Sequence, residues 1–302
     1  MNTDRTFIDD LKHQMRYGSA TIRLIIINCA VFLVLGIIEV LARLSGNEAG
    51  IHLFLSDLVS LHPQLDYLLI RPWGLITSIF VHFDFIHLLM NMLFLYFSGQ
   101  MFESIFGSKR LMYTYIFGGL TGSILEVLAH LIFPVISVSQ ASVVGASGAI
   151  MAIFTALAFY RPKLKVNLFG ILPVPMIVLA AFFILSDIFS LGKSDGTAHF
   201  AHLGGVLFGA LSIQGLYSKG NIVTRIISFV ENLRSRFKRG PKLKVKKGGA
   251  TRGPEFKSDE DYNQEKKQRQ EKIDAILDKI SKSGYDSLTK EEKDFLFNQS
   301  NR

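Results

Sequence analysis

The sequence predicts an all-α polytopic membrane protein: a bundle of six transmembrane helices followed by a small, charged, helical C-terminal tail. Hydrophobic residues make up 49% of the 302 residues, charged residues only 19%, and the mean hydropathy is +0.31. A soluble domain is closer to a quarter charged. The apolar residues also gather into blocks of roughly the ~20 residues that cross a bilayer, which indicates an integral membrane protein.

Six apolar blocks predict six spans, and a retained first helix rather than a cleaved signal peptide follows the polar segment 1–23. The spans are Leu24–Leu41, Phe85–Phe102, Leu111–Phe133, Ser147–Tyr160, Ile171–Ser190 and Ala198–Tyr217. The fourth falls short of the usual ~20 residues. We therefore expect it to begin below the membrane surface, where a water-filled cavity could reach its first residue.

Positive charges predict the topology, because cytoplasmic loops carry an excess of Lys and Arg. The loops after spans two and four are basic, whereas Pro134–Val144 carries no positive charge. We therefore expect an inner-membrane protein with both termini in the cytoplasm and Ser147 near the outer face. Within the core at 24–217, the long connection 45–80 is amphipathic and contains Trp73, the single tryptophan, so we expect it to lie in the outer interface.

The region after the last span divides into a basic linker at 218–262 and a soluble helical tail at 263–302. Arg234–Lys247 holds eight Lys or Arg residues and no acid, which favours contact with anionic lipid over nucleic acid. An i, i+3, i+4, i+7 apolar pattern predicts a tail helix that ends at Gly284. Thr289 and Glu292 then form a capping box that opens a second short helix.

Three spans carry polar side chains that suggest nucleophilic catalysis. Ser147 lies in the run Gly145-Ala146-Ser147-Gly148 at the start of span four, and His202 lies near the start of span six. Histidine is the usual base that activates a serine hydroxyl. Gly205 and Gly209 follow His202 and permit close helix approach, which favours His202 over its competitor His199.

Attack of this serine on a peptide carbonyl would create an oxyanion on the substrate, and that oxyanion needs hydrogen-bond donors. His87 and Asn91 share one face of span two, and with the Ser147 amide they predict an oxyanion hole. No carboxylate has convincing spacing; Asp84, Asp187 and Asp195 are the nearest, so we expect a Ser–His dyad.

The same polar groups could serve two roles other than catalysis. Each motif alone could serve helix packing. The histidines at 82, 87, 199 and 202 could instead bind a metal, but the sequence has no H-E-x-x-H motif, and Cys29 is its single cysteine. We therefore expect no metal and no cofactor.

Taken together, the motifs resemble those of the bacterial rhomboid proteases. The resemblance covers about residues 71–211 and rests on these matches: His82-x4-His87-x3-Asn91, Gly99 and Glu103, Gly145-x-Ser147-Gly148, and His202-x2-Gly205-x3-Gly209. It implies a six-helix core, a cofactor-independent Ser147–His202 dyad, an oxyanion hole of His87, Asn91 and the Ser147 amide, and substrates that are transmembrane helices cut near their outer ends.

Two positions depart from the family pattern. Trp73-Gly74 stands where some members have Trp-Arg, and Met151 stands where an aromatic residue often stacks on the catalytic imidazole. A methionine sulfur can also pack against a ring. The alternative function is a catalytically silent relative that binds transmembrane clients, although Ser147, His202 and the flanking glycines are all present. A transporter is disfavoured because no inverted repeat is visible.

Overall fold

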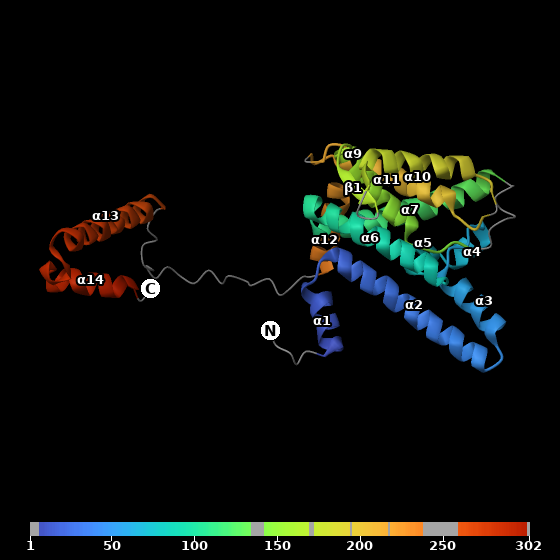
Figure 1. Cartoon of the computed structure of the whole chain (residues 1–302), viewed down its shortest axis with the longest axis horizontal. Coiled ribbons are helices and arrows are strands. Elements are labelled where there is room, and N and C mark those ends of the chain that lie inside the picture. The colour runs from blue at the N-terminus through green and yellow to red at the C-terminus, as the bar shows by residue number, and fades with distance from the viewer. Residues whose placement is uncertain are drawn as a thin grey trace, which may run out of the picture. The chain divides into compact units, whose positions relative to one another are not determined.

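The six predicted spans are six helices of one bundle. The computed structural model describes residues 6–133, 142–168, 172–193, 195–216, 218–237 and 259–300. It divides into two units, Met1–Arg239 and Gly240–Arg302. The apolar helices of the first unit are α2 (Ala20–Leu44), α6 (Phe85–Phe106), α7 (Ser108–Ile132), α9 (Ser147–Tyr160), α10 (Met176–Ser190) and α11 (His199–Ile213), which run side by side in Figure 1. The predicted all-α bundle is confirmed.

The helices differ in length in a way that matters for the site. Helices α2, α6 and α7 are long and apolar enough to cross a membrane, whereas α9, α10 and α11 have 14, 15 and 15 residues. Helix α9 begins and ends at the predicted residues, and α11 is shorter than expected because it ends at Ile213. Tyr217, the predicted end of that span, lies outside the described residues.

Span five begins later than the sequence predicts. Residues Leu172–Pro175 form strand β2, which pairs antiparallel with strand β1 (Lys165–Leu168). Helix α10 therefore starts at Met176, directly after Pro175, which is its N-cap. Proline lacks the N–H that a helix interior needs, so the two prolines of β2 oppose an earlier helix start. The predicted first residue, Ile171, lies outside the described residues.

Glycines bring α11 against its two neighbours at backbone distance. A Cβ added to Gly205 or Gly209 would overlap the carbonyl oxygen of Gly148 or Ala152 on α9. On the α7 side, a Cβ at Gly204 would lie 2.7 Å from the Cα of Gly122. The close approach predicted from the glycine spacing is thus present, and α9 is buried along nearly its whole length between its neighbours.

Short helices fill the connection between α2 and α6, which is predicted to lie in the membrane interface. They are α3 (Glu48–Val59), α4 (Leu65–Ile70), α5 (Gly74–Thr77) and the 3-10 turn Ser78–Phe80. The Trp73 indole N–H donates to the Leu58 carbonyl oxygen over 2.8 Å. A Cβ at Gly74 would lie 2.6 Å from the Ser60 carbonyl oxygen, so glycine lets these two segments approach closely.

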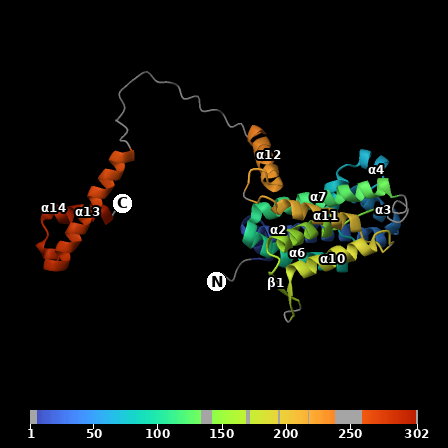
Figure 2. The ribbon, with the colours of Figure 1, turned by 90° about the horizontal axis from the view of Figure 1, so that it is seen from above.

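Two further helices, α1 (Phe7–Tyr17) and α12 (Ile222–Phe237), lie at the end of the bundle where α2 begins (Figures 1 and 2). The sequence predicts that residues 222–237 belong to the linker, but in the structure they form helix α12, whose first half packs against the core. The Arg110 guanidinium donates to Asn221 Oδ1 over 3.1 Å and to Thr224 Oγ1 over 2.9 Å. Val223 is fully buried beside α11. These contacts hold the start of α12 against the bundle.

The C-terminal unit contains α13 (Asp259–Ser283), a 3-10 turn (Tyr285–Ser287) and α14 (Lys290–Ser300). Gly284 ends α13 with a positive φ of 76°, as predicted. The predicted capping box is also present: the Thr289 amide donates to Glu292 Oε2 over 2.7 Å, and the Glu292 amide donates to Thr289 Oγ1 over 3.3 Å. This backbone hydrogen bond from Thr289 is the main reason that the pKa of Glu292 lies below its usual value. Most of the basic run Arg234–Lys247 lies outside the described residues.

A half-buried acid ties α6 to the start of α2. Glu103 accepts hydrogen bonds from the amides of Ala20 and Thr21 over 2.7 and 3.0 Å, from the Thr21 hydroxyl over 2.7 Å and from the Ser108 hydroxyl over 2.6 Å. A Cβ at Gly99 would lie 2.8 Å from the Thr21 side chain, so this glycine lets the two helices meet. Glu103 therefore satisfies amides at the α2 N-terminus that have no intrahelical partner.

We expect Glu103→Ala to lower the free energy of unfolding by about 3 kcal/mol or more, because it leaves several donors without a charged acceptor. Equilibrium unfolding of the purified protein in mixed detergent micelles measures the change. The control is Glu103→Gln, which keeps one acceptor oxygen and should lose less. An alanine variant as stable as the wild type would contradict the anchoring role.

Candidate active site

Ser147 is the first residue of α9, and three hydrogen bonds fix the chain that precedes it. The Val143 amide donates to the Leu61 carbonyl oxygen over 2.8 Å, and the Gly145 amide donates to the Ser78 carbonyl oxygen over 2.9 Å. The Ala146 amide donates to His82 Nε2 over 3.3 Å. His82 is fully buried, so this sequence-predicted supporting residue acts on the backbone beside the serine.

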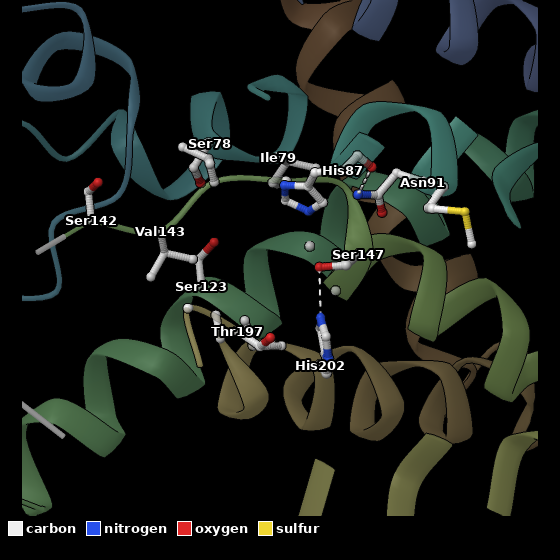
Figure 3. A pocket seen from close by; sticks show the side chains of 18 of the residues that line it. Ser78, Ile79, His87, Asn91, Ser123, Ser142, Val143, Ser147, Thr197 and His202 are labelled. Atoms are coloured by element: carbon white, nitrogen blue, oxygen red, sulfur yellow. Dashed lines mark hydrogen bonds between the residues drawn. The ribbon is translucent and has the colours of Figure 1, made fainter. Parts of the chain in front are cut away.

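His202 lies in the first turn of α11 and reaches the serine directly. Its Nε2 is 2.8 Å from Ser147 Oγ, and Figure 3 marks this hydrogen bond with a dashed line. The close contact between α11 and α9 creates this distance, because Gly205 lies one turn beyond His202 and against Gly148. The structure therefore brings together the two side chains that the sequence selects as nucleophile and base.

The sequence shows no carboxylate with convincing spacing to the histidine, but the structure places one beside it. Asp187 on α10 is buried, and its Oδ1 lies 2.9 Å from His202 Nδ1. An ionised carboxylate only accepts hydrogen bonds, so His202 Nδ1 carries the proton and His202 Nε2 is free to accept the proton of the serine hydroxyl. The geometry is that of a Ser–His–Asp series.

His199, the competing candidate for the base, contacts two carboxylates. Its Nδ1 lies 2.8 Å from Asp187 Oδ1 and its Nε2 lies 3.1 Å from Asp195 Oδ2. Both ring nitrogens of His199 thus contact carboxylates. His199 and His202 share one oxygen of Asp187, the Oδ1 atom.

Asp195 lies in the connection before α11 and is more exposed than Asp187. Its pKa lies below the usual value, first because the Thr197 amide donates a hydrogen bond to the carboxylate and further because His199 contacts it. Asp195 is therefore ionised at neutral pH and extends the chain of contacts from His202 to the protein surface.

The same side chains have the chemistry of metal ligands. One ligand atom from each of Asp187, His199 and His202 lies within 4.8 Å of the others among the described residues. Histidine nitrogens and carboxylate oxygens are ligands that zinc accepts. In the structure these atoms already pair with one another by hydrogen bonds, which accounts for their grouping.

The two predicted oxyanion donors line one cavity with the serine. This cavity has a volume of about 390 Å³, and its lining includes His87, Asn91, Ser147 and His202 (Figure 3). One N–H of the Asn91 amide donates to the His87 carbonyl oxygen over 3.0 Å, which leaves the second N–H of that amide for a ligand. The His87 ring packs against His82 with the ring centroids 5.0 Å apart.

A second cavity of about 380 Å³ also borders the serine and the histidine. Its lining includes Met151, Phe154 and Phe183 together with Ser147 and His202. Met151, a position that departs from the family pattern in the sequence analysis, is buried one turn along α9 from Ser147. Ser147 and His202 thus border two cavities, of which the second is the more apolar.

In the sequence, Asp187 is named among the three nearest carboxylates but is given no role, because spacing along the chain does not show which of them reaches His202. Asp187 lies on another helix, 15 residues before His202. One signal was available: Asp187 is the single acidic residue in the sequence of α10. An ionisable side chain within an apolar span is costly and is for that reason a functional candidate.

Comparison with known proteins agrees with the fold. Residues 70–219 match the Rhomboid domain family, and residues 257–302 match a family of unknown function (DUF6576). The chain is 33% identical over 153 residues to RHOMBOID-like protein 12, mitochondrial, of Arabidopsis thaliana, covering 47% of this chain and 46% of that protein. It is 31% identical over 161 residues to Rhomboid protease GluP of Bacillus subtilis, covering 52% of this chain and 29% of that protein.

A third relative, Rhomboid-like protease 3 of Toxoplasma gondii, is 29% identical over 141 residues, covering 45% of this chain and 49% of that protein. The chain therefore spans less than half the length of each of these curated relatives. The family match and the six apolar helices identify it as an integral membrane protein that belongs to the rhomboid family.

Gly145, two residues before Ser147, is a position where a side chain would meet both backbone strain and a close contact. Its φ is 122°, and an added Cβ would lie 2.8 Å from His87 Cε1. We expect Gly145→Ala to lower the free energy of unfolding by about 1–3 kcal/mol through backbone strain and displacement of the His87 ring. Equilibrium unfolding in detergent measures this loss.

The matched control is Gly46→Ala. Gly46 also has a positive φ, 75°, but an added Cβ would meet nothing within 4 Å. We expect the smaller loss there. Equal losses at both glycines would mean that contact with His87 contributes nothing to the requirement for glycine at position 145.

Proposed function

We propose that this protein is an intramembrane serine endopeptidase that hydrolyses peptide bonds in or near the transmembrane helices of membrane proteins. The observation that carries the proposal is the 2.8 Å hydrogen bond between Ser147 Oγ and His202 Nε2, beside a cavity lined by hydrogen-bond donors. Membership of a family that includes proteases supports it.

The proposed reaction uses groups that lie within reach of one another. His202 Nε2 takes the proton of the Ser147 hydroxyl as Oγ attacks the scissile carbonyl carbon. The oxyanion that forms accepts hydrogen bonds from the Ser147 amide and from the side chains of His87 and Asn91. His202 then gives the proton to the leaving amine. In the second half of the reaction His202 takes a proton from a water molecule that attacks the acyl-enzyme, and it returns that proton to Ser147 Oγ as the acid product leaves.

Asp187 orients the base in this scheme. Its hydrogen bond to His202 Nδ1 selects the tautomer in which Nε2 accepts a proton, and its charge stabilises the imidazolium that forms. We therefore replace the Ser–His dyad expected from the sequence with a proposed Ser147–His202–Asp187 series. No metal or cofactor takes part in the proposed reaction.

We place the protein in the inner membrane with both termini in the cytoplasm. Lys109, Arg110, Arg161 and Lys163 lie at the start of α7 or just after α9, at the end of the bundle opposite to Ser147. This distribution agrees with the excess of positive charge on cytoplasmic loops. The site then lies near the outer face, where it would meet the outer end of a substrate helix. The basic run after α12 would lie beside anionic lipid.

The alternative is a catalytically silent rhomboid-like protein that binds transmembrane clients. Relatives named only as rhomboid-like leave this open for the family. The hydrogen bond between Ser147 and His202 argues against it, because a client binder has no need for an aligned nucleophile and base.

The first test uses purified protein in liposomes with several reporter proteins that each contain one transmembrane helix. We expect the wild type to cleave a reporter and to react with a fluorophosphonate probe, and Ser147→Ala and His202→Ala to do neither while remaining folded. Activity retained by His202→Ala but lost in His199→Ala would move the base to His199. A wild type that cleaves no reporter and does not react with the probe would favour the client binder.

A second test separates the dyad from the proposed series. We expect Asp187→Asn to lower kcat by about 100-fold, the size of a general-base contribution, because the amide can donate to His202 Nδ1 and stabilise the wrong tautomer. KM should change little. Asp195→Asn serves as the control, since Asp195 contacts His199 and not His202, and an Asp187→Asn variant with the wild-type kcat would restore the simple dyad.

A further inference from the structure

Glu126 is a buried acidic residue in the apolar helix α7. Neither the sequence motifs nor the proposed reaction gives it a role. It is the single acid in the sequence of α7, and its side chain is 1% exposed. A buried acid is costly in the interior of a membrane protein unless it is well paired. Glu126 therefore depends on partners within the bundle, and these partners indicate its role.

The carboxylate of Glu126 contacts the helix that carries His202. Its Oε2 accepts a hydrogen bond from the Ala201 amide over 3.0 Å. Ala201 is the third residue of α11, and amides in the first turn of a helix have no intrahelical partner.

The carbonyl group of Ala201 lies close to glycines on two neighbouring helices. A Cβ added to Gly122 on α7 would lie 2.5 Å from the Ala201 carbonyl oxygen, and a Cβ added to Gly148 on α9 would lie 2.9 Å from it. The peptide between Ala201 and His202 thus runs between two glycines, while the amide of Ala201 is held by Glu126. Glycine contacts allow α11 to approach, and the hydrogen bond to Glu126 fixes the position of α11 along its axis.

A neighbouring histidine keeps Glu126 in place. His130 lies one turn further along α7; its Nδ1 is 3.0 Å from the Glu126 carbonyl oxygen and 3.4 Å from Glu126 Oε1. His130 is also buried. The carboxylate of Glu126 therefore has a partner on each oxygen, one on its own helix and one on α11.

We propose that Glu126 is a positioning residue for His202: its hydrogen bond to the Ala201 amide sets where α11 begins and so holds His202 Nε2 within reach of Ser147. This inference rests on the proposed protease activity. Catalytic geometry tolerates little error, since a misplacement of about 1 Å can cost about 100-fold in rate. Within the described residues, Glu126 itself makes no hydrogen bond to Ser147 or His202.

Three substitutions separate length, hydrogen bonding and charge. Glu126→Gln keeps an acceptor oxygen at the same distance, so we expect a kcat within about threefold of the wild type. Glu126→Asp keeps the charge but is one methylene too short to reach the Ala201 amide, and Glu126→Leu removes the acceptor. For both we expect kcat to fall by about 100-fold with KM within about twofold, because the base and not the substrate is displaced.

The control is Thr114→Val on the same helix. Thr114 is fully buried, its hydroxyl makes no hydrogen bond within the described part of the chain, and it lies away from the site. We expect its kcat and its unfolding midpoint to match those of the wild type. This variant separates the effect of Glu126 from a general effect of changing a buried polar group in α7.

Hydrogen–deuterium exchange of the full-length protein gives a readout that does not depend on activity. We expect the peptide covering 198–206 to exchange at least tenfold faster in Glu126→Asp and Glu126→Leu than in the wild type, with the peptide covering 147–160 unchanged. Glu126→Gln should exchange like the wild type. If Glu126→Leu fails to fold, Glu126→Asp and Glu126→Gln decide the question by the same measurements.

The outcomes distinguish this inference from the proposed function. Unchanged exchange and kcat in Glu126→Asp would overturn the positioning role even if the wild type is an active protease. A Glu126→Gln variant as impaired as Glu126→Leu would also overturn it, because charge and not the hydrogen bond would then matter. If the wild type shows no activity, faster exchange confined to α11 in Glu126→Asp still supports the anchor, and unchanged exchange rejects it.

Discussion

The close approach of α11 to α9 and α7 is the constraint on which the rest of the site depends. Gly205 and Gly209 bring α11 against the backbone of α9, and Gly204 meets Gly122 on the other side. Without these contacts His202 and Ser147 would lie farther apart than a hydrogen bond allows, since side chains at the interface would separate the two helices. Packing between small residues therefore sets the 2.8 Å contact between these side chains as directly as the choice of the two residues does.

Acidic side chains within the bundle fix the positions of helices that the glycines allow to approach. Small residues let helices approach but leave them free to slide, because a smooth surface offers little that resists translation. Glu103 fixes the start of α2 through the Ala20 and Thr21 amides, and Glu126 contacts the start of α11 through the Ala201 amide. Each hydrogen bond satisfies an amide that the helix itself leaves free; such a bond is worth about 0.5–1.5 kcal/mol to a neutral acceptor and about 1.5–3 kcal/mol to an ionised one.

The sequence predicts the helices better than it predicts the site around them. Apolar blocks identify all six helices, and the boundaries of α9 agree because Gly145 and Arg161 are clear ends. The sequence also selects Ser147 and His202, since their motifs are local. Asp187 and Glu126 could not be assigned a role, because each acts on a helix distant in sequence, and only the folded bundle brings them to α11. The β-hairpin and α12 were missed for different reasons. Residues Leu172–Pro175 of β2 continue the apolar block of span five, and the basic residues of α12 look like a linker until its tertiary contacts are known.

Two short helices place opposing electrostatic demands on the site. Ser147 begins α9 and His202 lies in the first turn of α11, so both lie at the positive ends of helix dipoles. That position favours an oxyanion on the substrate but opposes the imidazolium that the proposed reaction forms on His202. The dipole effect is about 0.3–1 kcal/mol, rising to about 2 kcal/mol when partly buried. The hydrogen bond that His202 Nδ1 donates to the Asp187 carboxylate is worth about 1.5–3 kcal/mol, so it offsets the dipole at the imidazole without removing it at the serine amide. The placement of Asp187 on α10, away from the start of α9, is what allows one end of the bundle to stabilise both charges.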